Sequence, residues 1–500
     1  MPSQIIDLEE LKKYDNFVMG YGHFNSIHPG HIRYLKHAKL LATKFIICIR
    51  GDGNTKDGKP KYQFNQKERA EALAMLDIAD GILLLKDDEL VEIIKVTKPK
   101  LLVLGKQFEK NPGEAIAKSI ETLSKRNISV LYHGGDISYS SSELLTSSED
   151  EIKLKRKQEF NAACKRQSLT KKSLEKSIES WKDANLIVIG DTIVDRYVAC
   201  EAIGMSAEAP VVVVKELQNR DFAGGAAIVA SHIRSLGAKC KLISVIGDDN
   251  NGKFVKEKLL KEEINDGLII DISRPTTFKK RYIVENQKLF RVSRLEQSEV
   301  DKDIEKKIID ELKHSAKQAT GIVVSDFVYG VLTKKIIQTI HELADRYNLM
   351  LFGDLQCSSQ VGSILKFEKF SLLCPNEREA RIALHEKDLD LESLSNQIIE
   401  KTRSQMLIMK LGPNGFIAYD NTEKVVNNQA FPALSINPVD VAGAGDSLLA
   451  VMSVGLSSSQ KMMPTAAIAC CMAALAVERM GNKPIKVDEI LDYISYKLEK

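Results

Sequence analysis

Short runs of apolar residues alternate with amphipathic stretches over the first part of the chain. Within the stretch 32–41, apolar residues recur about every three positions, as expected for a helix with one buried face. Continuous apolar strands that alternate with such helices are typical of a parallel sheet covered on both sides. The pattern therefore predicts a doubly wound α/β domain over residues 1–145. Its expected strands are 17–19, 45–49, 82–85, 101–104 and 130–132.

Residues 184–500 show the same alternation, which predicts a second, larger α/β domain. Two regions in it, 198–214 and 278–294, instead have the pattern of antiparallel strands, as in a small β lid beside a main sheet. Between the two domains, residues 146–183 are dense in Lys, Glu and Ser, and we interpret them as a charged, partly helical linker. The expected strands of the second domain are 186–189, 211–214, 242–246, 322–324 and 406–410.

The composition is that of a globular protein rather than of a disordered or membrane-spanning chain. Hydrophobic residues make up 44% of the 500 residues, and 71 basic against 68 acidic residues leave a net charge of +3. A balance this close to zero produces no global field that would attract nucleic acid or a membrane surface. No window approaches 18 consecutive apolar residues, and residues 1–11 lack the apolar core of a signal peptide. The eight cysteines include no C-x-x-C pair, so reduced thiols in a cytoplasmic protein are expected.

A segment with two histidines, 22–31 (GHFNSIHPGH), follows the expected strand 17–19 and opens a helix. His28 and His31 lie three residues apart at the helix N-terminus, where glycines allow the backbone to approach an anion closely. Neutral imidazoles can donate hydrogen bonds to phosphate oxygens while charge moves to a leaving pyrophosphate. No general base is needed if the nucleophile is itself a phosphate. Two other interpretations stay open: one histidine caps the helix and the other lies on the surface, or both bind zinc with a third ligand that the sequence does not obviously supply.

The histidine segment resembles the H-x-G-H signature of the cytidylyltransferase-like nucleotidyltransferases, which have a Rossmann-like fold. Two more segments within residues 16–145 are similar to that family: 65–69 (NQKER), at the start of an expected helix, and 137–145 (ISYSSSELL), a hydroxyl-rich ending. The resemblance implies catalytic roles for His28 and His31. The nucleotide that it implies is ATP, with CTP as the alternative. The residues that it implies for binding the nucleotide phosphates are Gly22, His23, Phe24, Arg69, Ser140, Ser141 and Ser142.

A second segment with candidate chemistry, 440–447 (DVAGAGDS), precedes the helical stretch 448–456. Its small residues expose successive backbone N–H groups at a helix start, which makes a cradle for phosphate charge. Asp446 could then take the proton from an attacking sugar hydroxyl. An ordinary structural turn is the alternative, because Gly-Ala-Gly turns are common.

This segment resembles the D-T-x-G-A-G-D signature of the ribokinase (PfkB) sugar kinases. Three further segments are similar to that family: 222–227 (FAGGAA), 375–379 (PNERE) and 410–415 (KLGPNG). The resemblance implies a ribokinase-like α/β domain with a β lid, a requirement for Mg²⁺ and ATP, and Asp446 as the catalytic base. It also implies that Asn376 and Glu379 organise the Mg²⁺ indirectly. The residues that it implies for nucleotide and phosphate binding are Lys410, Gly412, Gly443, Ala444 and Gly445.

Within the sugar kinases, the likeness is strongest to the kinase half of the bifunctional ADP-heptose synthesis enzymes. The similar segments are 190–197 (GDTIVDRY), 206–211 (SAEAPV), 286–291 (NQKLFR) and 325–327 (SDF). The sugar-binding residues that this resemblance implies are Asp191, Asp195, Gly224, Gly225 and Arg281.

The chain departs from these enzymes in several ways. The order of its two domains is reversed, and Asn25 stands where an Asp of the acceptor site is expected. Leu355 and Gln356 replace the Pro and Lys of a D-P-K segment. One Asn and two cations expected on the sugar side are also replaced, which should weaken the grip on a phosphorylated sugar. The residues at those three positions are Ile228, Gly204 and Tyr329.

The sequence therefore predicts a bifunctional sugar kinase and sugar-phosphate nucleotidyltransferase that makes an activated sugar. ADP-heptose for lipopolysaccharide or another surface glycan is the first expectation. The expected partners are sugar phosphates, nucleoside triphosphates and a second copy of the chain docked through the kinase lid, with neither nucleic acid nor membrane among them. Two alternatives stay open: the same activities on a different sugar or with CTP, or a kinase-like domain that only binds sugar or holds a dimer.

Overall fold

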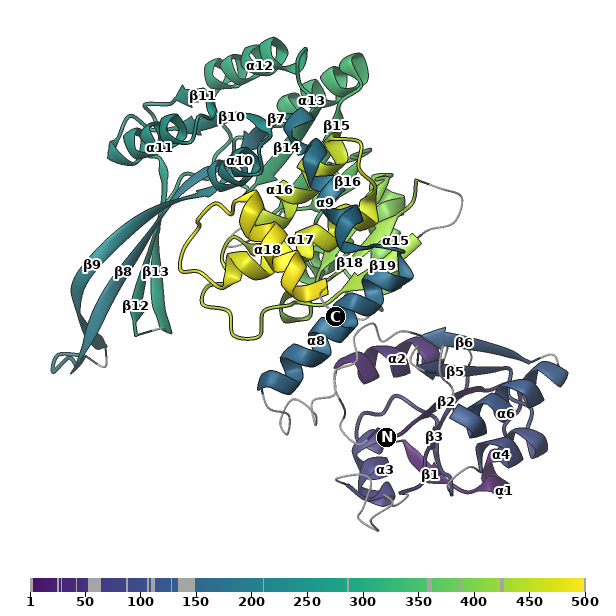
Figure 1. Cartoon of the computed structure of the whole chain (residues 1–500). Helices are drawn as coiled ribbons and strands as arrows, with labels where there is room; N and C mark the ends of the chain where they lie inside the picture. Colours follow the sequence, from purple (N-terminus) through teal and green to yellow (C-terminus); the bar gives the residue numbers. More distant parts are fainter. Residues whose placement is uncertain are drawn as a thin grey trace. The chain divides into compact units, whose positions relative to one another are not determined.

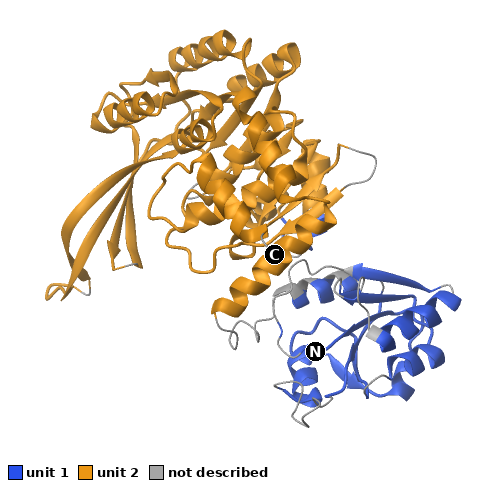
Figure 2. Cartoon of the chain, viewed as in Figure 1, with its two compact units in different colours: residues 1–147, 386–394 blue, residues 148–385, 395–500 orange. Residues whose placement is uncertain are grey.

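The computed structural model divides the chain into two compact units (Figure 2). Unit 1 consists of Met1–Ser147 with Glu386–Leu394, and unit 2 consists of Ser148–His385 with Ser395–Lys500. The residues that the structure describes are 3–24, 27, 29–41, 43–52, 64–86, 89–105, 108, 113–126, 128–133, 149–209, 211–285, 287–357, 362–386, 389–422 and 427–498.

Unit 1 is built on a six-stranded parallel sheet in the order β1-β4-β3-β2-β5-β6. Its strands are β1 (Gln4–Ile6), β2 (Val18–Gly22), β3 (Phe45–Ile49), β4 (Gly81–Leu84), β5 (Leu101–Gly105) and β6 (Ser129–His133). The described helices are α1 (Leu8–Leu11), α2 (Pro29–Leu40), α3 (Gln66–Ala74), α4 (Leu90–Val96) and α6 (Gly113–Lys125). The strand order reverses between β2 and β5. Doubly wound folds bind ligands at such a switch point, outside the carboxyl ends of the strands.

The strands of unit 1 are buried on both faces, as their continuous apolar runs predict. In β3, Phe45 and Ile47 belong to one apolar core, whereas Ile46 and Cys48 belong to another on the opposite face. All five strands expected from the sequence are present. The additional strand β1 pairs with β4 at the edge of the sheet, and its three residues are too few to give a recognisable pattern.

Unit 2 contains a nine-stranded sheet in the order β11-β10-β7-β14-β15-β16-β17-β18-β19. Its strands are β7 (Asn185–Gly190), β10 (Lys239–Ile246), β11 (Asn265–Ile270), β14 (Gly321–Asp326), β15 (Met350–Leu355), β16 (Leu372–Leu373), β17 (Met406–Lys410), β18 (Phe416–Asp420) and β19 (Asn427–Phe431). The strands from β11 to β17 are parallel to their neighbours, and β18 and β19 are added in antiparallel pairs. The predicted parallel α/β sheet is thus present.

Helices cover both faces of this sheet (Figure 1). They are α8 (Glu149–Arg166), α9 (Lys171–Glu179), α10 (Ala226–Ser235), α11 (Asn250–Lys261), α12 (Lys302–Ala316), α13 (Lys334–Tyr347), α14 (Glu377–Leu384), α15 (Leu391–Thr402), α16 (Ala444–Ser457), α17 (Met462–Val477) and α18 (Val487–Leu498). Helices α10, α16 and α17 share one large apolar core with the strands, and α12 and α13 pack on the other face. None of the described helices is both long and apolar enough to cross a membrane.

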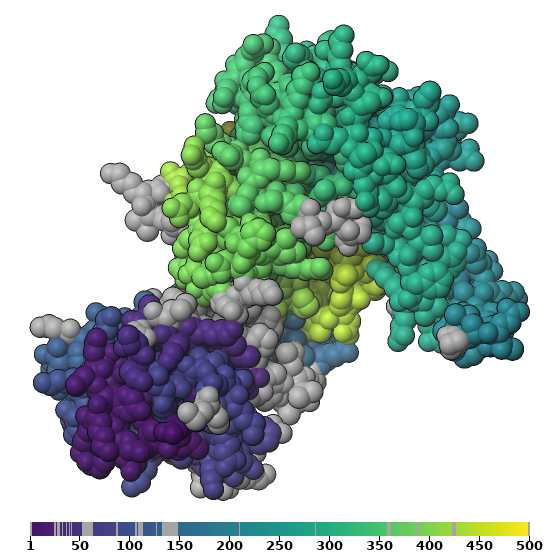
Figure 3. Space-filling model, turned by 180° about the vertical axis from the view of Figure 1, so that it is seen from behind, coloured from purple at the N-terminus to yellow at the C-terminus, as the bar shows by residue number. Residues whose placement is uncertain are grey.

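A second sheet in unit 2 forms the β lid, in the order β13-β12-β8-β9. Its strands are β8 (Thr192–Met205), β9 (Val212–Gly225), β12 (Thr277–Val284) and β13 (Gln287–Arg294). The two outer pairs are antiparallel, as predicted, but β12 runs parallel to β8. The lid strands extend beyond the helices of the unit (Figures 1 and 3). Because β8 starts directly after β7, the lid is joined to the main sheet at the carboxyl end of this interior strand.

Residues 149–183, expected to be part of a charged linker, are mostly helical and pack on unit 2. The side chains of Phe160 in α8 and Trp181 after α9 are fully buried in its large apolar core. Arg156 of α8 also donates a hydrogen bond to the carbonyl oxygen of Ala433 (2.7 Å). The stretch is thus helical, as expected in part, and its apolar residues belong to the core of unit 2. The stretch exposes many charges on one side and buries a narrow apolar stripe on the other.

The position of the domain boundary stays a prediction, and we place it before Glu149. Residues 149–500 expressed alone should fold as a stable unit, because they retain α8 and α9. Residues 183–500 should aggregate or unfold at a temperature at least about 10 °C lower, since their core loses Phe160 and Trp181. Size-exclusion chromatography and thermal unfolding of the two fragments measure the difference. Equal stability would mean that the two helices are dispensable, as a linker would be.

All eight cysteines are free thiols, and seven of them are buried. Burial raises the pKa of Cys48 to about 12, which keeps its thiol protonated and unreactive. The structure thus agrees with the prediction of reduced core thiols.

Candidate functional site

The histidine segment of unit 1 lies at the switch point of its sheet. Strand β2 ends at Gly22 and α2 begins at Pro29, so His31 lies in the first turn of the helix, as predicted. The ring of Phe24 lies against the His31 ring, with 5.3 Å between the two centroids. A Cβ on Gly22 would lie 2.8 Å from the Phe24 ring, so this contact requires a glycine. Three of the predicted residues therefore meet where a helix N-terminus would receive an anion.

Arg69, predicted to bind phosphate, is buried and holds the loops around this site together. Its guanidinium donates hydrogen bonds to the carbonyl oxygen of His23, to that of Arg50 (3.0 Å) and to a carboxylate oxygen of Asp52 (2.8 Å). These bonds join the residue after β2 to the residue after β3. Arg69 thus positions the backbone of His23, and its contact with phosphate stays a prediction.

Tyr34 anchors α2 across the switch point, a role that its place in the helical pattern did not reveal. Its hydroxyl donates to the carbonyl oxygen of Val103 in β5 (2.7 Å) and accepts the N–H of Tyr21 in β2 (3.0 Å). The start of α2 is therefore held beside both strands of the switch point. Four other predicted residues lie outside the described residues, so their roles stay predictions: His28, Ser140, Ser141 and Ser142.

In unit 2, the small-residue segment forms the start of α16. Gly443 precedes the helix with a φ of +83°, a left-handed conformation that favours glycine. No side chain of the described residues caps this helix, so the N–H groups of Ala444 and Gly445 are available to an anion. A Cβ on Gly445 would lie 3.3 Å from the Lys410 ammonium, which therefore faces the helix start. Gly412, also predicted, follows Lys410 by two residues in the turn after β17.

Three carboxylates surround the Lys410 ammonium. Lys410 Nζ donates to both carboxylate oxygens of Asp354, at 2.8 and 2.7 Å. Burial alone would lower the pKa of Lys410, but the charges of Asp354 and Glu379 raise it. Burial also raises the pKa of the Glu379 carboxyl, against the attraction of Lys410. With Asp446 as the third acidic group, the cluster contains three carboxyl groups around one ammonium.

Asp446 is the member of this cluster that we predicted to be the catalytic base. It lies in the first turn of α16 and is buried. Burial raises the pKa of Asp446 to about 7, and the charge of Asp354 adds to this rise. The Lys410 ammonium and a hydrogen bond from Gln356 Nε2 (2.9 Å) act in the opposite direction. A carboxylate with a pKa near neutral pH is well matched to accept a proton from a hydroxyl.

Asn376 and Glu379, the predicted organisers of Mg²⁺, bind each other's backbone at the start of α14. Asn376 Oδ1 accepts the Glu379 N–H, and Glu379 Oε2 accepts the Asn376 N–H, both at 2.8 Å. A backbone bridge to Lys410 places the pair beside the charged cluster. Among the described residues, no set of three or more His, Cys, Asp or Glu side chains is arranged to hold a metal ion. A divalent cation here would need further ligands from nucleotide or water, which fits an indirect role for the pair.

The predicted sugar-binding residues meet where the lid joins the main sheet. Gly225 precedes α10 with a φ of +60°, and a Cβ there would collide with the carbonyl oxygen of Asp191. The backbone of Gly224 lies directly against the Asp195 carboxylate. Arg281 of β12 forms an ion pair with Asp195 of β8. The structure therefore brings all five predicted residues together.

Asp191 is fixed by the backbone that follows β14. Its Oδ2 accepts the N–H groups of Phe327 (2.8 Å) and Tyr329 (3.2 Å). Its Oδ1 is buried without a hydrogen-bond partner among the described residues, and so is the neighbouring Thr192 Oγ1. Burial and the charge of Asp326 raise the pKa of Asp191. Buried polar atoms are unfavourable unless they are satisfied, so these two atoms are available to water or to a polar ligand.

Asn482 joins the residues predicted to bind sugar to those predicted to bind phosphate. Its Nδ2 donates to Asp195 Oδ2 (3.2 Å), and a Cβ on Gly443 would lie 2.5 Å from its Oδ1. The charge of Asp195 also contributes to the raised pKa of Asp446. The predicted residues of unit 2 thus form one site with a carboxylate between its two sides. Sequence reasoning missed Asn482, because nothing in its neighbourhood marks it.

Comparison with known proteins identifies the family to which residues 183–487 belong. A family profile described as "pfkB family carbohydrate kinase" matches residues 183–487. The chain belongs to the pfkB family of carbohydrate kinases. It is 31% identical over 324 residues to the bifunctional protein HldE of Campylobacter jejuni subsp. doylei, which covers 64% of this chain and 67% of that protein. It is 34% identical over 310 residues to the HldE of Helicobacter acinonychis, and the match covers 61% of this chain and 65% of that protein. As a pfkB kinase, the chain is a transferase.

Solved structures share the fold of the pfkB region. Phosphofructokinase-2 from Escherichia coli, in complex with substrates and products, matches 63% of this chain and 100% of its own with a TM-score of 0.53 and 15% identity. The match to ribokinase from Thermotoga maritima covers 62% of this chain and 99% of the ribokinase chain, with a TM-score of 0.50 and 21% identity. At these identities, the likeness establishes the ribokinase-like fold that the sequence predicts.

A hydrogen-bond network attaches the lid of this pfkB kinase to the loop that precedes α16. Asp440, the first residue of the motif, accepts hydrogen bonds from Tyr197 Oη (2.6 Å) and Lys288 Nζ (2.7 Å). Burial alone would raise the pKa of Asp440, but the bonds from Lys288 and Tyr197 lower it. Tyr197 lies on β8 and Lys288 on β13, so movement of the lid away from the cradle must break these bonds.

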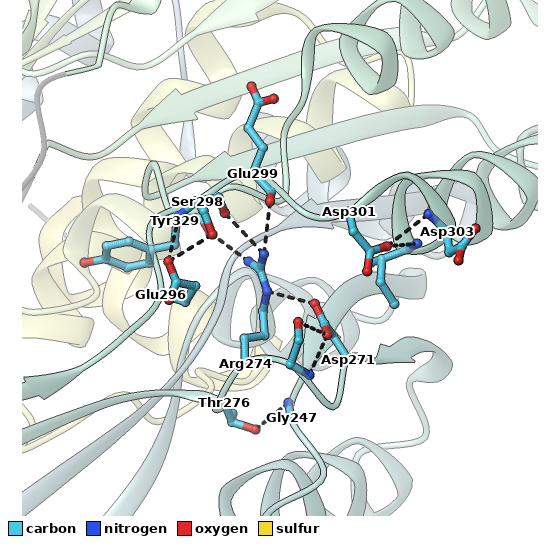
Figure 4. A network of polar contacts seen from close by, with 12 residues as sticks. Gly247, Asp271, Arg274, Thr276, Glu296, Ser298, Glu299, Asp301, Asp303 and Tyr329 are labelled. Atoms are coloured by element: carbon cyan, nitrogen blue, oxygen red, sulfur yellow. Dashed lines mark hydrogen bonds and ion pairs between the residues drawn. The ribbon is translucent and has the colours of Figure 1, made fainter.

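A small polar hollow opens beside Asp191 of the pfkB kinase. In Figure 4, Arg274 reaches the backbone of Tyr329, whose ring points away from it. The same guanidinium donates to the Asp271 carboxylate (2.9 Å) and to the carbonyl oxygen of Ser298 (3.2 Å). Arg274 is therefore part of the frame of this pocket. Residues that line it include Asp191, Thr192, Arg274, Thr277, Glu296 and Tyr329.

The departures from the ADP-heptose enzymes fall in different parts of the pfkB kinase. Ile228 is fully buried on α10, and Tyr329 is buried with its ring stacked on Phe327. Gln356 stands in place of a lysine and still bonds Asp446. Gly204 lies at the exposed end of β8, where a Cβ would meet no described atom within 4 Å.

Proposed function

We propose that the chain is a bifunctional enzyme. Unit 2 phosphorylates a sugar phosphate, and unit 1 converts a sugar 1-phosphate into a nucleotide sugar. The observation that carries the kinase half is the position of Asp446, a buried carboxylate between the sugar side and an uncapped helix N-terminus. The histidine segment at the switch point of a parallel sheet supports the nucleotidyltransferase half.

In the proposed kinase step, Asp446 accepts the proton of a sugar hydroxyl as that oxygen attacks the γ-phosphorus of ATP. The bond from the γ-phosphorus to the bridging oxygen breaks, and ADP leaves. The N–H groups at the start of α16 and the Lys410 ammonium stabilise the charge of the group in transfer. Asp191 and Asp195 hold the sugar through its hydroxyls.

ATP and Mg²⁺ are the proposed cofactors of this step. The acidic cluster around Lys410 lies where the phosphates of ATP would bring the ion, and the remaining ligands would be phosphate oxygens and water. Asn376 and Glu379 would hold the ion indirectly. The ion would supply neutralisation of the phosphate charge.

In the proposed nucleotidyl transfer, a phosphate oxygen of the sugar 1-phosphate attacks the α-phosphorus of a nucleoside triphosphate. The bond between the α- and β-phosphates breaks, and pyrophosphate leaves. His28 and His31 donate hydrogen bonds to the oxygens that gain charge. The attacking phosphate is already anionic, so no base is required. We propose ATP as the nucleotide and ADP-heptose for a surface glycan as the product, from the resemblance of residues 190–197 and 286–291 to the ADP-heptose enzymes.

A product assay tests both halves. The full chain is incubated with Mg²⁺, with ATP or CTP, and with each of a panel of heptose, hexose and pentose phosphates, and the products are identified by mass. We expect one sugar phosphate to gain a second phosphate and one sugar 1-phosphate to give a nucleotide sugar with pyrophosphate. A nucleotide sugar that forms only with CTP would show that CTP, and not ATP, is the nucleotide of unit 1. Absence of any phosphorylated sugar would favour a kinase-like domain that only binds sugar.

We also propose that two copies of the chain associate through the lid. The outer part of the lid exposes apolar side chains, among them Ile203, Met205 and Phe290, and exposed apolar patches of this kind mark interaction surfaces. Light scattering should therefore give twice the chain mass of 55.7 kDa. Met205→Glu combined with Phe290→Glu should give the mass of a single chain. A single-chain mass for the wild type would contradict the proposal.

A further inference from the structure

Lys279 of β12 is buried beside the predicted sugar side, with 3% of its surface exposed. It is directly paired with Asp195 of β8 in parallel register, so both side chains point to the same face of the lid. Arg281, two residues later, shares this face and forms the ion pair with Asp195. Lys280 points to the opposite face, where it pairs with Glu216 (2.7 Å). Lys279 is therefore on the side of the lid that faces the sugar.

The Lys279 ammonium lies over two aromatic rings that follow β14. It is 5.0 Å from the ring centroid of Phe327 and 5.2 Å from that of Tyr329, and the two rings are stacked. The backbone N–H groups of these same two residues bond Asp191. Aromatic faces attract a cation without neutralising it. The ammonium is thus held near a predicted sugar ligand with its charge available.

Five other cations around this site have a carboxylate partner. These pairs are Arg274–Asp271, Arg281–Asp195, Lys288–Asp440, Lys366–Asp326 and Lys410–Asp354. Within the part of the chain that the structure describes, Lys279 forms no such ion pair. A buried charge without a counter-ion is unfavourable. Among the cations named here, Lys279 is therefore the one that remains for an anionic ligand.

The small polar hollow beside Asp191 shares Tyr329 with the surroundings of Lys279. Thr277 precedes Lys279 by two residues on the same face of β12 and lines the pocket together with Tyr329. Asp191 Oδ1 and Thr192 Oγ1, also at the pocket, lack hydrogen-bond partners among the described residues. Groups that bind hydroxyls and a group that binds an anion thus lie side by side. A sugar that carries a phosphate has this combination of groups.

We propose that Lys279 binds the phosphate of the sugar substrate and selects phosphorylated over neutral sugars. The inference rests on the proposed kinase function. It also bears on the expectation that the replacements at Gly204 and Tyr329 weaken the grip on a sugar phosphate. The Lys279 ammonium reaches the Tyr329 ring, so it supplies positive charge where the sequence has lost a cation.

Steady-state kinetics of the full chain test this, with the best sugar phosphate of the panel and the same sugar without its phosphate. In Lys279→Met, KM for the phosphorylated sugar should rise roughly 10- to 100-fold, because a charge-assisted hydrogen bond is lost. The kcat values, and KM for the neutral sugar, should change less than about twofold. Lys279→Arg should recover most of the affinity. Inorganic phosphate should compete with the sugar phosphate in the wild type and not in Lys279→Met.

Lys280→Met is the matched control, because it removes the same charge from the next residue on the opposite face of β12. It should leave both KM values unchanged. An equal rise of both KM values in Lys279→Met would show a structural role and overturn the proposal. Wild-type preference for the neutral sugar would overturn it as well. If the wild type phosphorylates no sugar, the kinase proposal fails instead. Calorimetric titration of the wild type and of Lys279→Met with the sugar phosphates then decides whether Lys279 binds phosphate.

Discussion

Asp446→Asn is expected to reduce sugar-dependent ATP consumption to background, a loss of roughly 10²–10⁴-fold, while sugar binding stays measurable. Asparagine has nearly the same size as aspartate, but it cannot accept the proton of the attacking hydroxyl. The predicted sugar ligands Asp191 and Asp195 are untouched by this change. ADP release measures the kinase step, and calorimetric titration with the sugar measures binding.

Asp303→Asn is a suitable control, since it removes an exposed carboxylate from α12. Its ATP consumption should equal that of the wild type. ATP consumption at the wild-type level in Asp446→Asn would exclude Asp446 as the base. Loss of sugar binding in that variant would instead assign Asp446 to substrate binding.

The pH dependence follows from the same carboxylate. Burial, with the charge of Asp354, raises the pKa of Asp446 to about 7, so its protonated form persists up to neutral pH and cannot accept a proton. The kcat/KM should therefore rise with pH through about 7 and level off above it. Gln356→Lys places a positive charge where Gln356 now bonds Asp446 and should move this rise down by about one pH unit. A wild-type profile that is flat from about pH 5.5 to 8 would contradict the assignment.

His31→Ala should slow pyrophosphate release by roughly 10²–10³, and His28→Ala should do the same, because each removes one donor to the transition state. Sugar phosphorylation should be unchanged in both variants, and Asp446→Asn should show the reverse pattern. Production of the nucleotide sugar and release of pyrophosphate measure the effect. His314→Ala, at an exposed position of α12, is the control. Wild-type rates in both variants would mean that the H-x-G-H assignment is wrong.

The main strands could be predicted because a buried parallel strand is a continuous apolar run, as in β3, whatever surrounds it. The helix α8 could not be placed in the same way. Of its 18 residues, the described buried ones are Phe160, Ala163 and Cys164. So narrow an apolar stripe among so many charges looks the same in sequence as a solvated helix. Its packing partners lie hundreds of residues away, as the bond from Arg156 to Ala433 shows.

The uncapped helix start at Gly443 could be predicted because it is made by adjacent residues: the left-handed Gly443 and the first turn of α16 belong to one segment. The contact between Asn482 and Asp195 joins residues 287 positions apart, and no local pattern records it. Lys279 and Lys280 are neighbours of the same type. Only the face of β12 to which each side chain points distinguishes a buried cation from an exposed one, and that face is set by the pairing with β8.

Strand β8 connects two regions with different proposed roles. It begins at Thr192, beside Asp191, and ends at Met205, in the apolar surface proposed as a contact between two chains. Its pairing with β9 and β12 keeps it in register over most of this length. If sugar binding beside Asp191 shifts the strand, it changes the affinity of one chain for another at Met205. Association of two chains then changes the affinity for sugar by the same factor, because coupling free energy is reciprocal. Under the two proposals, association of the chains and binding of the sugar are linked equilibria, and we expect the affinity for sugar to depend on protein concentration.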